Sequence, residues 1–244
     1  MKQVLILGAT SDIAKALAHE YGREGYGLML AAREAKKRLS ITCHDLEIRY
    51  GVTAKAIEFD AVDFANHEAF YRNLTEVPAI VVCVFGYLGD QSLAIRDFEE
   101  SRKILETNYL GAVSILNVIA NDFESRKDGS IIGISSVAGD RGRQSNYLYG
   151  SAKAGFSAYL SGLRNRLYGS QVHVMTVKPG FIFTKMTENM NLPPALTAQP
   201  DQVAKDIVRA GRSQRDVLYT RWFWRYIMLI ICLIPESIFK RLKL

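Results

Sequence analysis

The stretch that decides the fold is Val4-Leu5-Ile6-Leu7-Gly8-Ala9-Thr10-Ser11-Asp12-Ile13-Ala14. Its branched apolar residues predict a buried strand, and a helical pattern follows the glycine turn. A strand, a tight turn and a helix N-terminus together form a cradle for phosphate groups. The turn keeps Gly8 but has Asp12 and Ala14 where later glycines often occur. A plain strand–turn–helix capped by Ser11 or Asp12 is therefore an alternative to dinucleotide binding.

The rest of the chain repeats this alternation of strand and helix. We expect strands near residues 3–7, 26–32, 54–59, 79–84, 129–135, 171–177 and 216–220. We expect helices near residues 11–24, 36–50, 64–75, 98–121, 147–168 and 201–212. Repeated units of this kind, with right-handed crossovers, predict a Rossmann-type α/β fold with a doubly wound parallel sheet. We expect a single domain over residues 1–220, followed by a C-terminal apolar amphipathic tail over residues 221–244.

The composition is that of a globular protein. The chain has 244 residues, of which 48% are hydrophobic and 23% charged, and these values exclude a disordered chain. Cys43, Cys83 and Cys232 lie far apart in apolar surroundings, so we expect reduced thiols in the cytoplasm. We expect no metal site, because no cysteines and histidines cluster along the sequence. The first predicted strand begins at residue 3, so we also expect no signal peptide.

A second stretch carries chemistry. It reads Tyr149-Gly150-Ser151-Ala152-Lys153, and Ser136 lies thirteen residues before the tyrosine. On a helix, residues four apart share one face and lie about one turn from each other. An ammonium beside a phenol stabilises the phenolate, so we expect Lys153 to lower the pKa of Tyr149 toward working pH. The phenol would then serve as a proton donor or acceptor in carbonyl chemistry.

In register, these motifs resemble the short-chain dehydrogenase/reductase family over nearly all of residues 1–220. The matching positions are the turn from Gly8 to Ala14, Asp60 after the third strand, Asn108 in Thr107-Asn108-Tyr109-Leu110-Gly111, Ser136, Tyr149, Lys153, and Lys178-Pro179-Gly180 with Thr184. The resemblance implies a catalytic tetrad of Asn108, Ser136, Tyr149 and Lys153. It also implies cofactor contacts from Gly8, Thr10, Ser11, Asp12, Ile13, Asp60, Ala61, Gly86, Tyr149, Lys153, Pro179, Gly180, Ile182 and Thr184.

The resemblance further assigns a role to each member of the tetrad. Ser136 would donate a hydrogen bond to the substrate carbonyl, and Tyr149 would deliver the proton. Lys153 would bind the nicotinamide ribose, and Asn108 would hold a water that links the lysine to solvent. Plainer alternatives exist, with Ser136 as a turn residue, Asn108 in a helix hydrogen bond and Thr184 as an N-cap.

Two departures from the family pattern lie near the cofactor. The second and third turn glycines are missing, which puts the usual pyrophosphate geometry in question. The family's Asn-Asn-Ala-Gly after the fourth strand reads Cys83-Val84-Phe85-Gly86, so its asparagine contacts must be made differently or lost. Neither departure touches the tetrad.

The end of the second predicted strand bears on cofactor choice. It reads Leu28-Met29-Leu30-Ala31-Ala32-Arg33, with no acid to bind a ribose 2′-hydroxyl. Arg33 suits a 2′-phosphate instead, which predicts NADP(H) and the direction of reduction. The alternative is an ordinary surface arginine at the start of a helix.

Residues 182–199 have the composition of a lid over the site. They contain Met186, Met190, Leu192, Pro193, Pro194 and Leu196. Flexible apolar side chains of this kind suit an apolar or partly apolar substrate. A lid that packs only over the cofactor is the alternative.

The tail, residues 221–244, is apolar and basic. Its uncharged run from Tyr226 to Ile234 is too short for a spanning helix, which needs about 20 residues. Trp222 and Trp224 suit a membrane interface, and five basic residues against one acid give the tail +4 of the net charge of +6. That charge therefore does not indicate a nucleic-acid surface. We expect a segment lying in the inner face of the membrane, bent at Pro235, or alternatively a helix in a homo-oligomer interface.

The tail, the stretch Gly86-Tyr87-Leu88-Gly89-Asp90-Gln91 and the Ser-Asp-Ile turn are similar to one branch of the family, the decaprenylphosphoryl-2-keto-erythro-pentose reductases. The resemblance implies NADPH-dependent reduction of a 2-keto sugar on a polyprenyl phosphate, with a flavin-dependent oxidase as partner. The protein would be cytoplasmic and peripherally bound to the membrane. A reductase of soluble or acyl ketones whose tail lies in an oligomer interface remains open. So does a non-catalytic NADP-binding protein that recruits a partner.

Overall fold

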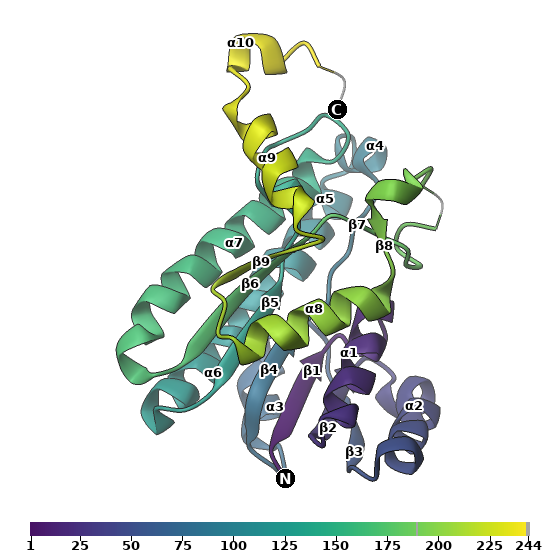
Figure 1. The fold of residues 1–244 in the computed structure, drawn as a ribbon, viewed down its shortest axis with the longest axis vertical. Helices are drawn as coiled ribbons and strands as arrows, with labels where there is room; N and C mark the ends of the chain where they lie inside the picture. The colour runs from purple at the N-terminus through teal and green to yellow at the C-terminus, as the bar shows by residue number, and fades with distance from the viewer. Residues whose placement is uncertain (189, 243–244) are drawn as a thin grey trace.

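The computed structural model describes residues 1–188 and 190–242 and shows one α/β domain (Figure 1). Seven parallel strands form one sheet in the order β3-β2-β1-β4-β5-β6-β9. The strands are β1 (Gln3–Leu7), β2 (Gly27–Ala32), β3 (Ala54–Glu58), β4 (Pro78–Cys83), β5 (Ser130–Ile134), β6 (His173–Pro179) and β9 (Val217–Thr220). The order reverses direction at β1, so the predicted doubly wound sheet is confirmed, with each strand within a few residues of its expected place.

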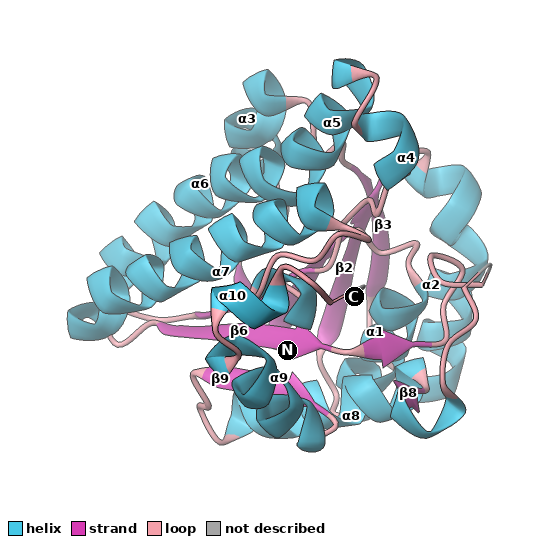
Figure 2. Ribbon diagram, turned by 90° about the horizontal axis from the view of Figure 1, so that it is seen from above, coloured by secondary structure: helices cyan, strands magenta, loops and turns pink. Residues whose placement is uncertain are grey.

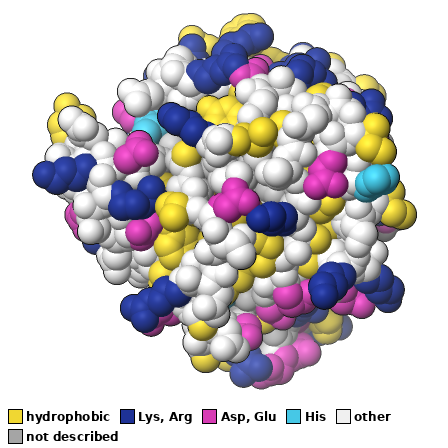
Figure 3. Space-filling model, turned by 90° about the horizontal axis from the view of Figure 1, so that it is seen from below, with side chains coloured by type: hydrophobic (Ala, Val, Ile, Leu, Met, Phe, Trp, Pro, Cys, Tyr) yellow, Lys and Arg dark blue, Asp and Glu magenta, His cyan; other side chains and the backbone are white. Residues whose placement is uncertain are grey.

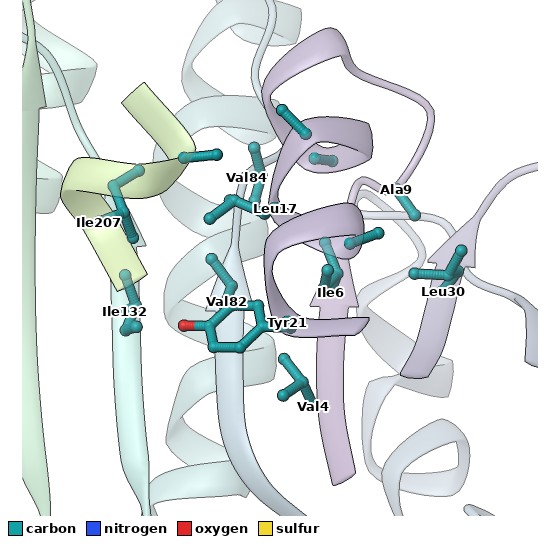
Figure 4. Close-up of a cluster of buried hydrophobic side chains, with 14 of the residues drawn as sticks. Val4, Ile6, Ala9, Leu17, Tyr21, Leu30, Val82, Val84, Ile132 and Ile207 are labelled. Carbon is teal, nitrogen blue, oxygen red and sulfur yellow. The ribbon is translucent and has the colours of Figure 1, made fainter. Parts of the chain in front are cut away.

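Helices cover both faces of the sheet (Figure 2). The long helices are α1 (Asp12–Arg23), α2 (Ala35–Tyr50), α6 (Gly111–Arg126), α7 (Tyr147–Leu167) and α8 (Pro200–Arg212). Alternate residues of β1 point to opposite faces of the sheet. Val4 and Ile6 join the hydrophobic cluster under α1, α2 and α8 (Figure 4). Leu5 and Leu7 join the cluster under α6 and α7. Burial on both faces explains why β1 reads as a continuous apolar run.

Two of the expected helices are interrupted. The helix expected over 64–75 consists of a 3₁₀ turn over Phe64–Asn66 and the short helix α3 (His67–Arg72). The helix expected over 98–121 consists of α5 (Phe98–Leu105), a π-helical turn over Glu106–Leu110 and α6. Helical periodicity continues through both interruptions, so the sequence pattern did not reveal them.

Three short elements were not expected from the sequence. Helix α4 (Gln91–Ala94) follows β4, and its N-cap Asp90 accepts hydrogen bonds from the backbone N–H groups of Ser92 and Leu93. Strand β7 (Phe181–Ile182) pairs with β8 (Thr197–Ala198), which closes the expected lid segment at its base. All three lie at the carboxyl end of the sheet (Figure 1).

The tail forms two helices, α9 (Phe223–Leu233) and α10 (Glu236–Phe239), with the expected break at Pro235. On α9, Trp224 and Met228 are buried against Val137, and the side chains of Tyr226, Leu229, Ile230 and Leu233 are exposed. The tail is therefore docked on the domain beside the carboxyl edge of the sheet (Figure 1). Its predicted headgroup contact Lys243 lies outside the described residues. Within the described residues, no helix has both the length and the apolar character needed to cross a membrane.

Candidate active site

The carboxyl ends of five strands bring the predicted motifs together. Gly8 follows β1, Asp60 follows β3, Gly86 follows β4, Ser136 follows β5 and Gly180 follows β6. The opposite end of the molecule shows basic and acidic side chains interspersed (Figure 3). The site therefore lies where ligands bind in open α/β sheets.

The glycine turn has one position that requires glycine. Gly8 has φ +91°, and a Cβ there would come within 2.6 Å of the backbone nitrogen of Phe85. Ser11, not Asp12, is the N-cap of α1, because its hydroxyl accepts from the N–H of Ala14 at 3.2 Å. The Asp12 carboxylate accepts instead from the N–H of Lys185 at 2.8 Å. The residue in place of a turn glycine thus ties the turn to the lid segment.

Two cavities that share Gly86 lie along this edge. The first, which we call the turn cavity, has a volume of about 260 Å³ and is lined by the predicted residues Gly8, Thr10, Arg33, Asp60, Ala61 and Gly86. The second, which we call the tyrosine cavity, has a volume of about 140 Å³ and is lined by Ile13, Gly86, Ser136, Tyr149, Lys153, Pro179, Gly180, Ile182 and Thr184. Ser11, Asp12 and Asn108 lie beside these cavities without lining either.

Helix α7 carries the tyrosine and the lysine on one face, as expected. The Lys153 ammonium lies 5.7 Å from the centre of the Tyr149 ring and donates to the carbonyl oxygen of Ile134 at 3.1 Å. The Ser136 hydroxyl oxygen accepts from the N–H of Ala138 at 3.1 Å, so its proton remains available to another acceptor.

The expected lowering of the tyrosine pKa is wrong for this structure. Burial raises the pKa of Tyr149 to about 12, although a hydrogen bond with Ser136 acts in the opposite direction. Burial also lowers the pKa of Lys153 to about 8, because an ammonium loses hydration in the interior. The lysine is 3% exposed and donates to a backbone carbonyl, so desolvation is the main cause of its pKa shift.

Asn108 is buried in the π-helical turn, and its amide is engaged by the protein itself. Its Nδ2 donates to the carbonyl oxygens of Tyr87 at 2.6 Å and Ile104 at 2.8 Å, and its Oδ1 accepts from the N–H of Tyr87 at 3.2 Å. A Cβ on Gly86 would come within 2.9 Å of this Oδ1 and 3.4 Å of the Lys153 Nζ. Asn108 therefore fixes the segment after β4 close to the lysine.

The unusual segment after β4 replaces polar contacts with packing. The backbone of Phe85 lies against Gly8, and its ring lies 5.8 Å from that of Phe59. Cys83 is buried beneath it, and burial raises the pKa of its thiol to about 12. The departure from the family pattern at this point thus fills space behind the turn.

A second arginine lies near Arg33 in the turn cavity. Arg38, on the first turns of α2, also lines the turn cavity, and neither guanidinium forms an ion pair with a described residue. Glu58, at the end of the neighbouring strand β3, is used otherwise, because it accepts from the N–H groups of Glu34 and Ala35 at 2.8 and 2.9 Å. Sequence reasoning missed Arg38, although its position in the helix that follows Arg33 was a usable signal.

The lid segment contributes side chains to the tyrosine cavity. Met186 and Met190 line it, whereas Leu192 is buried in the segment itself. Thr184 lines the cavity as expected, and its N–H donates to Thr187 Oγ1 at 3.2 Å. The cavity thus has an apolar side formed by residues between β7 and β8.

The tail forms the outer support of the same cavity. The indole of Trp224 contacts Gly180, and its N–H donates to the carbonyl oxygen of Leu196 at 3.4 Å. Arg141, in the loop after Ser136, donates to the carbonyl oxygens at the end of α9 and to Glu236 at 2.7 Å. The tail therefore holds both the segment after β6 and the loop after β5.

Two further polar side chains line the tyrosine cavity. Arg143 Nε and Asn146 Oδ1 are buried and have no hydrogen-bond partner among the described residues. Sequence reasoning missed both, since the loop between Ser136 and Tyr149 carries no recognisable motif.

Comparisons with known proteins agree with this geometry. The family described as short chain dehydrogenase matches residues 2–194. An uncharacterized oxidoreductase of Mycobacterium tuberculosis is 34% identical over 98% of this chain and 96% of its own length. An uncharacterized oxidoreductase of Streptomyces coelicolor is 30% identical over 99% of this chain and 96% of its own length.

Solved structures show the same fold. A short-chain dehydrogenase from Sphingobium yanoikuyae in complex with NADPH has a TM-score of 0.83 at 22% identity, covering 97% of this chain and 98% of its own. An actinorhodin polyketide ketoreductase with NADPH has a TM-score of 0.80 at 22% identity, covering 91% and 97%. With the matching family profile and these relatives of 30% identity or more, the chain belongs to the short-chain dehydrogenase family and is an oxidoreductase that acts on CH–OH groups.

Proposed function

We propose that this protein uses NADPH to reduce a 2-keto sugar carried on a polyprenyl phosphate, at the cytoplasmic face of a membrane. The observation that carries the proposal is the position of the tail. One face of α9 is buried against the wall of the tyrosine cavity, and the other is apolar and exposed. A substrate held in a lipid surface would thus be presented beside the reacting groups. A flavin-dependent oxidase that makes the ketone is the expected partner.

The turn cavity fits the adenosine part of NADP(H). Gly8 would let the backbone approach a pyrophosphate, and Asp60 would meet the adenine. Arg33 and Arg38 line the same cavity, and their guanidinium groups suit a 2′-phosphate because charge-assisted bonds to phosphate are strong. The cofactor is therefore NADP(H).

The tyrosine cavity fits the reduction of a carbonyl. When bound, NADPH supplies the hydride. The Ser136 hydroxyl would donate to the carbonyl oxygen, while its own oxygen accepts from the N–H of Ala138. Tyr149 is the proton donor, and burial keeps it protonated before the reaction. Lys153, whose pKa burial lowers to about 8, would bind the ribose.

The exposed face of the tail suits a membrane surface. Trp222 is 73% exposed and Leu233 72%, which is unusual for large apolar side chains. Arg225 on α9, and Lys240 and Arg241 just after α10, are exposed and suit anionic headgroups. A tryptophan, leucines and basic residues on one short helical segment are typical of interfacial anchors.

The same exposed face supports a second candidate. A soluble or acyl ketone reductase could bury α9 against another copy of the chain, since an apolar helix face also suits a subunit contact. In that case the tail would support the site from within a homo-oligomer. A non-catalytic role is disfavoured by the intact arrangement of Ser136, Tyr149 and Lys153 around one cavity.

NADPH oxidation by the full-length protein in liposomes tests the proposal. The substrates are a polyprenyl-phosphate 2-keto-pentose and a panel of small and acyl ketones, with Tyr149→Phe as the inactive control. Turnover of the lipid-linked sugar well above the panel is expected. Turnover of small or acyl ketones alone would overturn the lipid-linked substrate and favour the oligomer. Absence of NADPH binding would overturn the whole proposal.

A further inference from the structure

Arg143 lies in the tyrosine cavity but has no part in the chemistry above. It stands in the loop between β5 and α7, seven residues after Ser136 and six before Tyr149. Its Nη2 donates to the carbonyl oxygen of Val137 at 3.2 Å and contacts the sulfur of Met228 on α9 at 3.9 Å. Its Nε is buried without a partner among the described residues. The Arg143 side chain is half-buried, and its enclosed, unused Nε–H indicates a missing acceptor.

The charges around the cavity are unbalanced. Lys153 and Arg143 both line it, and none of the described lining residues is acidic. The acid that acts on Arg143 is Asp140, but Asp140 already binds the Lys178 ammonium at 2.5 Å and the Tyr219 hydroxyl at 2.9 Å. A positive charge that is half-buried without its own counter-ion, as in Arg143, is costly to the folded protein. A ligand that brings a negative charge would relieve this cost.

Asn146 adds a second unused group in the same cavity. Its Oδ1 is buried without a partner among the described residues. Gln91 Nε2 is also buried and unpartnered, while Gln91 Oε1 accepts from the N–H of Leu148, next to Tyr149. Of these groups, the Asn146 amide oxygen and the Arg143 Nε–H line the same cavity, and they match a ligand with an anion and a neighbouring hydroxyl group.

The phosphates of the cofactor are not the counter-ion of Arg143. Arg33 and Asp60 follow β2 and β3, at one edge of the sheet order β3-β2-β1-β4-β5-β6-β9. Arg143 follows β5 and contacts α9, which comes after β9 at the other edge. Arg143 is thus on the substrate side of the tyrosine cavity.

We infer that Arg143 and Asn146 form a subsite for an anionic group on the ketone substrate. The inference rests on the proposed reductase function and adds the charge of its substrate. Arg143 binds the anion by charge-assisted hydrogen bonds, and Asn146 accepts from a hydroxyl beside it. The anion is the phosphate of a lipid-linked sugar or the carboxylate of a keto acid, which share this chemistry.

Matched ketones test the subsite through turnover. NADPH oxidation is compared for a 2-keto-pentose alkyl phosphate, a keto acid, and the neutral methyl ester of each. In Arg143→Gln, the kcat/KM ratio of anionic to neutral substrate should fall by about 10- to 100-fold, the usual effect of losing a hydrogen bond to a charge. Arg143→Lys should restore part of this preference for the anionic substrate. Preference for the phosphate or for the carboxylate distinguishes the two sources.

Arg166→Gln is the matched control. It removes the same charge from the far end of α7, where Arg166 is paired with Glu124 and does not line the cavity. The selectivity ratio should stay within about 2-fold of wild type in this variant. An equal fall in both arginine variants would contradict a local subsite, and an unchanged ratio in Arg143→Gln would overturn it.

A binding measurement keeps the inference testable without turnover. Decyl phosphate and decanol are titrated into the NADPH-loaded protein below the micelle concentration, followed by tryptophan fluorescence. Wild type should bind decyl phosphate at least about 10-fold more tightly than decanol, and Arg143→Gln should lose this preference. Equal affinities in wild type would overturn the subsite. Preference for decyl phosphate without reduction of any ketone would instead overturn the proposed function and leave the subsite standing.

Discussion

Trp224 on the tail helix lies directly against Gly180, the glycine that follows the sixth strand of the sheet. A Cβ at Gly180 would overlap the indole ring, which is 3% exposed and donates to Leu196. Gly180, which is expected to contact the cofactor, is thus also the residue against which the tail packs. The tail is for this reason part of the support of the site, although the sequence divides it from the domain at residue 220.

Trp224→Ala should destabilise the protein. Removal of a buried tryptophan typically costs about 3–5 kcal/mol, because both apolar contact and packing are lost. Trp222→Ala is the matched control, since Trp222 is 73% exposed and its loss should cost less than about 0.5 kcal/mol. Urea denaturation of the full chain measures both. Equal costs would contradict the docking of α9 on the domain.

Tyr149→Phe should abolish turnover and leave NADPH binding nearly unchanged. In the proposed mechanism the phenol hydroxyl is the proton donor, and its removal leaves the ring of a residue that lines the cavity. Steady-state NADPH oxidation and a fluorescence titration with NADPH separate the two properties. Turnover close to that of wild type would assign the proton to another group.

The buried lysine should leave a signature in the pH dependence of stability. The pKa of Lys153 is lowered to about 8 in the folded protein, against about 10.4 in an unfolded chain. Between these values the unfolded state binds one more proton, so the contribution of Lys153 to the free energy of unfolding rises with pH. Below pH 8 both states are protonated, and this contribution is flat.

Lys153→Met isolates that contribution. Other groups titrate in the same range, and the raised pKa values of the Cys83 thiol and of Tyr149 lower the stability as the pH rises. The free energy of unfolding should therefore be compared between wild type and Lys153→Met, by urea denaturation at several values from pH 7 to about 10. Above pH 8, the stability of wild type relative to the variant should increase. A constant difference would mean that the lysine is not desolvated.

Much of the architecture could be predicted because it depends on local signals. The apolar run from Val4 to Leu7 and its counterparts mark strands that are buried on both faces, and the motif residues follow the strand ends. The pKa of Tyr149 could not be predicted in this way. Its direction depends on how deeply α7 is buried and on the carbonyl of Ile134, which draws the lysine ammonium away.

Arg143 shows another limit of the sequence. An arginine in a polar loop usually faces solvent, and nothing in its neighbours indicates burial. Its environment is set by Met228, which is eighty-five residues away in sequence. Contacts of this kind depend on the docking of α9, so no motif around residue 143 could have revealed them.

Arg33→Glu should shift cofactor preference toward NADH. An acid at the end of β2 repels a 2′-phosphate and accepts from a ribose hydroxyl. Arg38→Gln should raise the KM for NADPH by about 10-fold or more and leave that for NADH nearly unchanged, because only NADPH carries the phosphate. Arg49→Gln, at the far end of α2 and paired with Asp45, is the control. Unaltered preference in both cavity variants would remove the arginines from cofactor selection.

The exposed face of the tail should bind anionic vesicles. Leu229 and Leu233 are 55% and 72% exposed on α9, and replacing both by glutamate adds charge without touching the buried Trp224. Loss of two apolar side chains and the gain of two acids should abolish cosedimentation with vesicles that contain phosphatidylglycerol. The urea midpoint should remain near that of wild type, because surface changes usually cost little.

Light scattering on the same variant separates the membrane from the oligomer. If the exposed face binds lipid, the double glutamate variant keeps the subunit number of wild type and loses only vesicle binding. If the face is a subunit contact, the variant dissociates to a smaller species and wild type does not sediment with vesicles. Cosedimentation that rises with anionic lipid and falls with salt would establish the electrostatic part of the contact, since exposed charges are screened over about 10 Å at 0.1 M salt. Salt-independent binding would assign the membrane contact to the apolar residues alone.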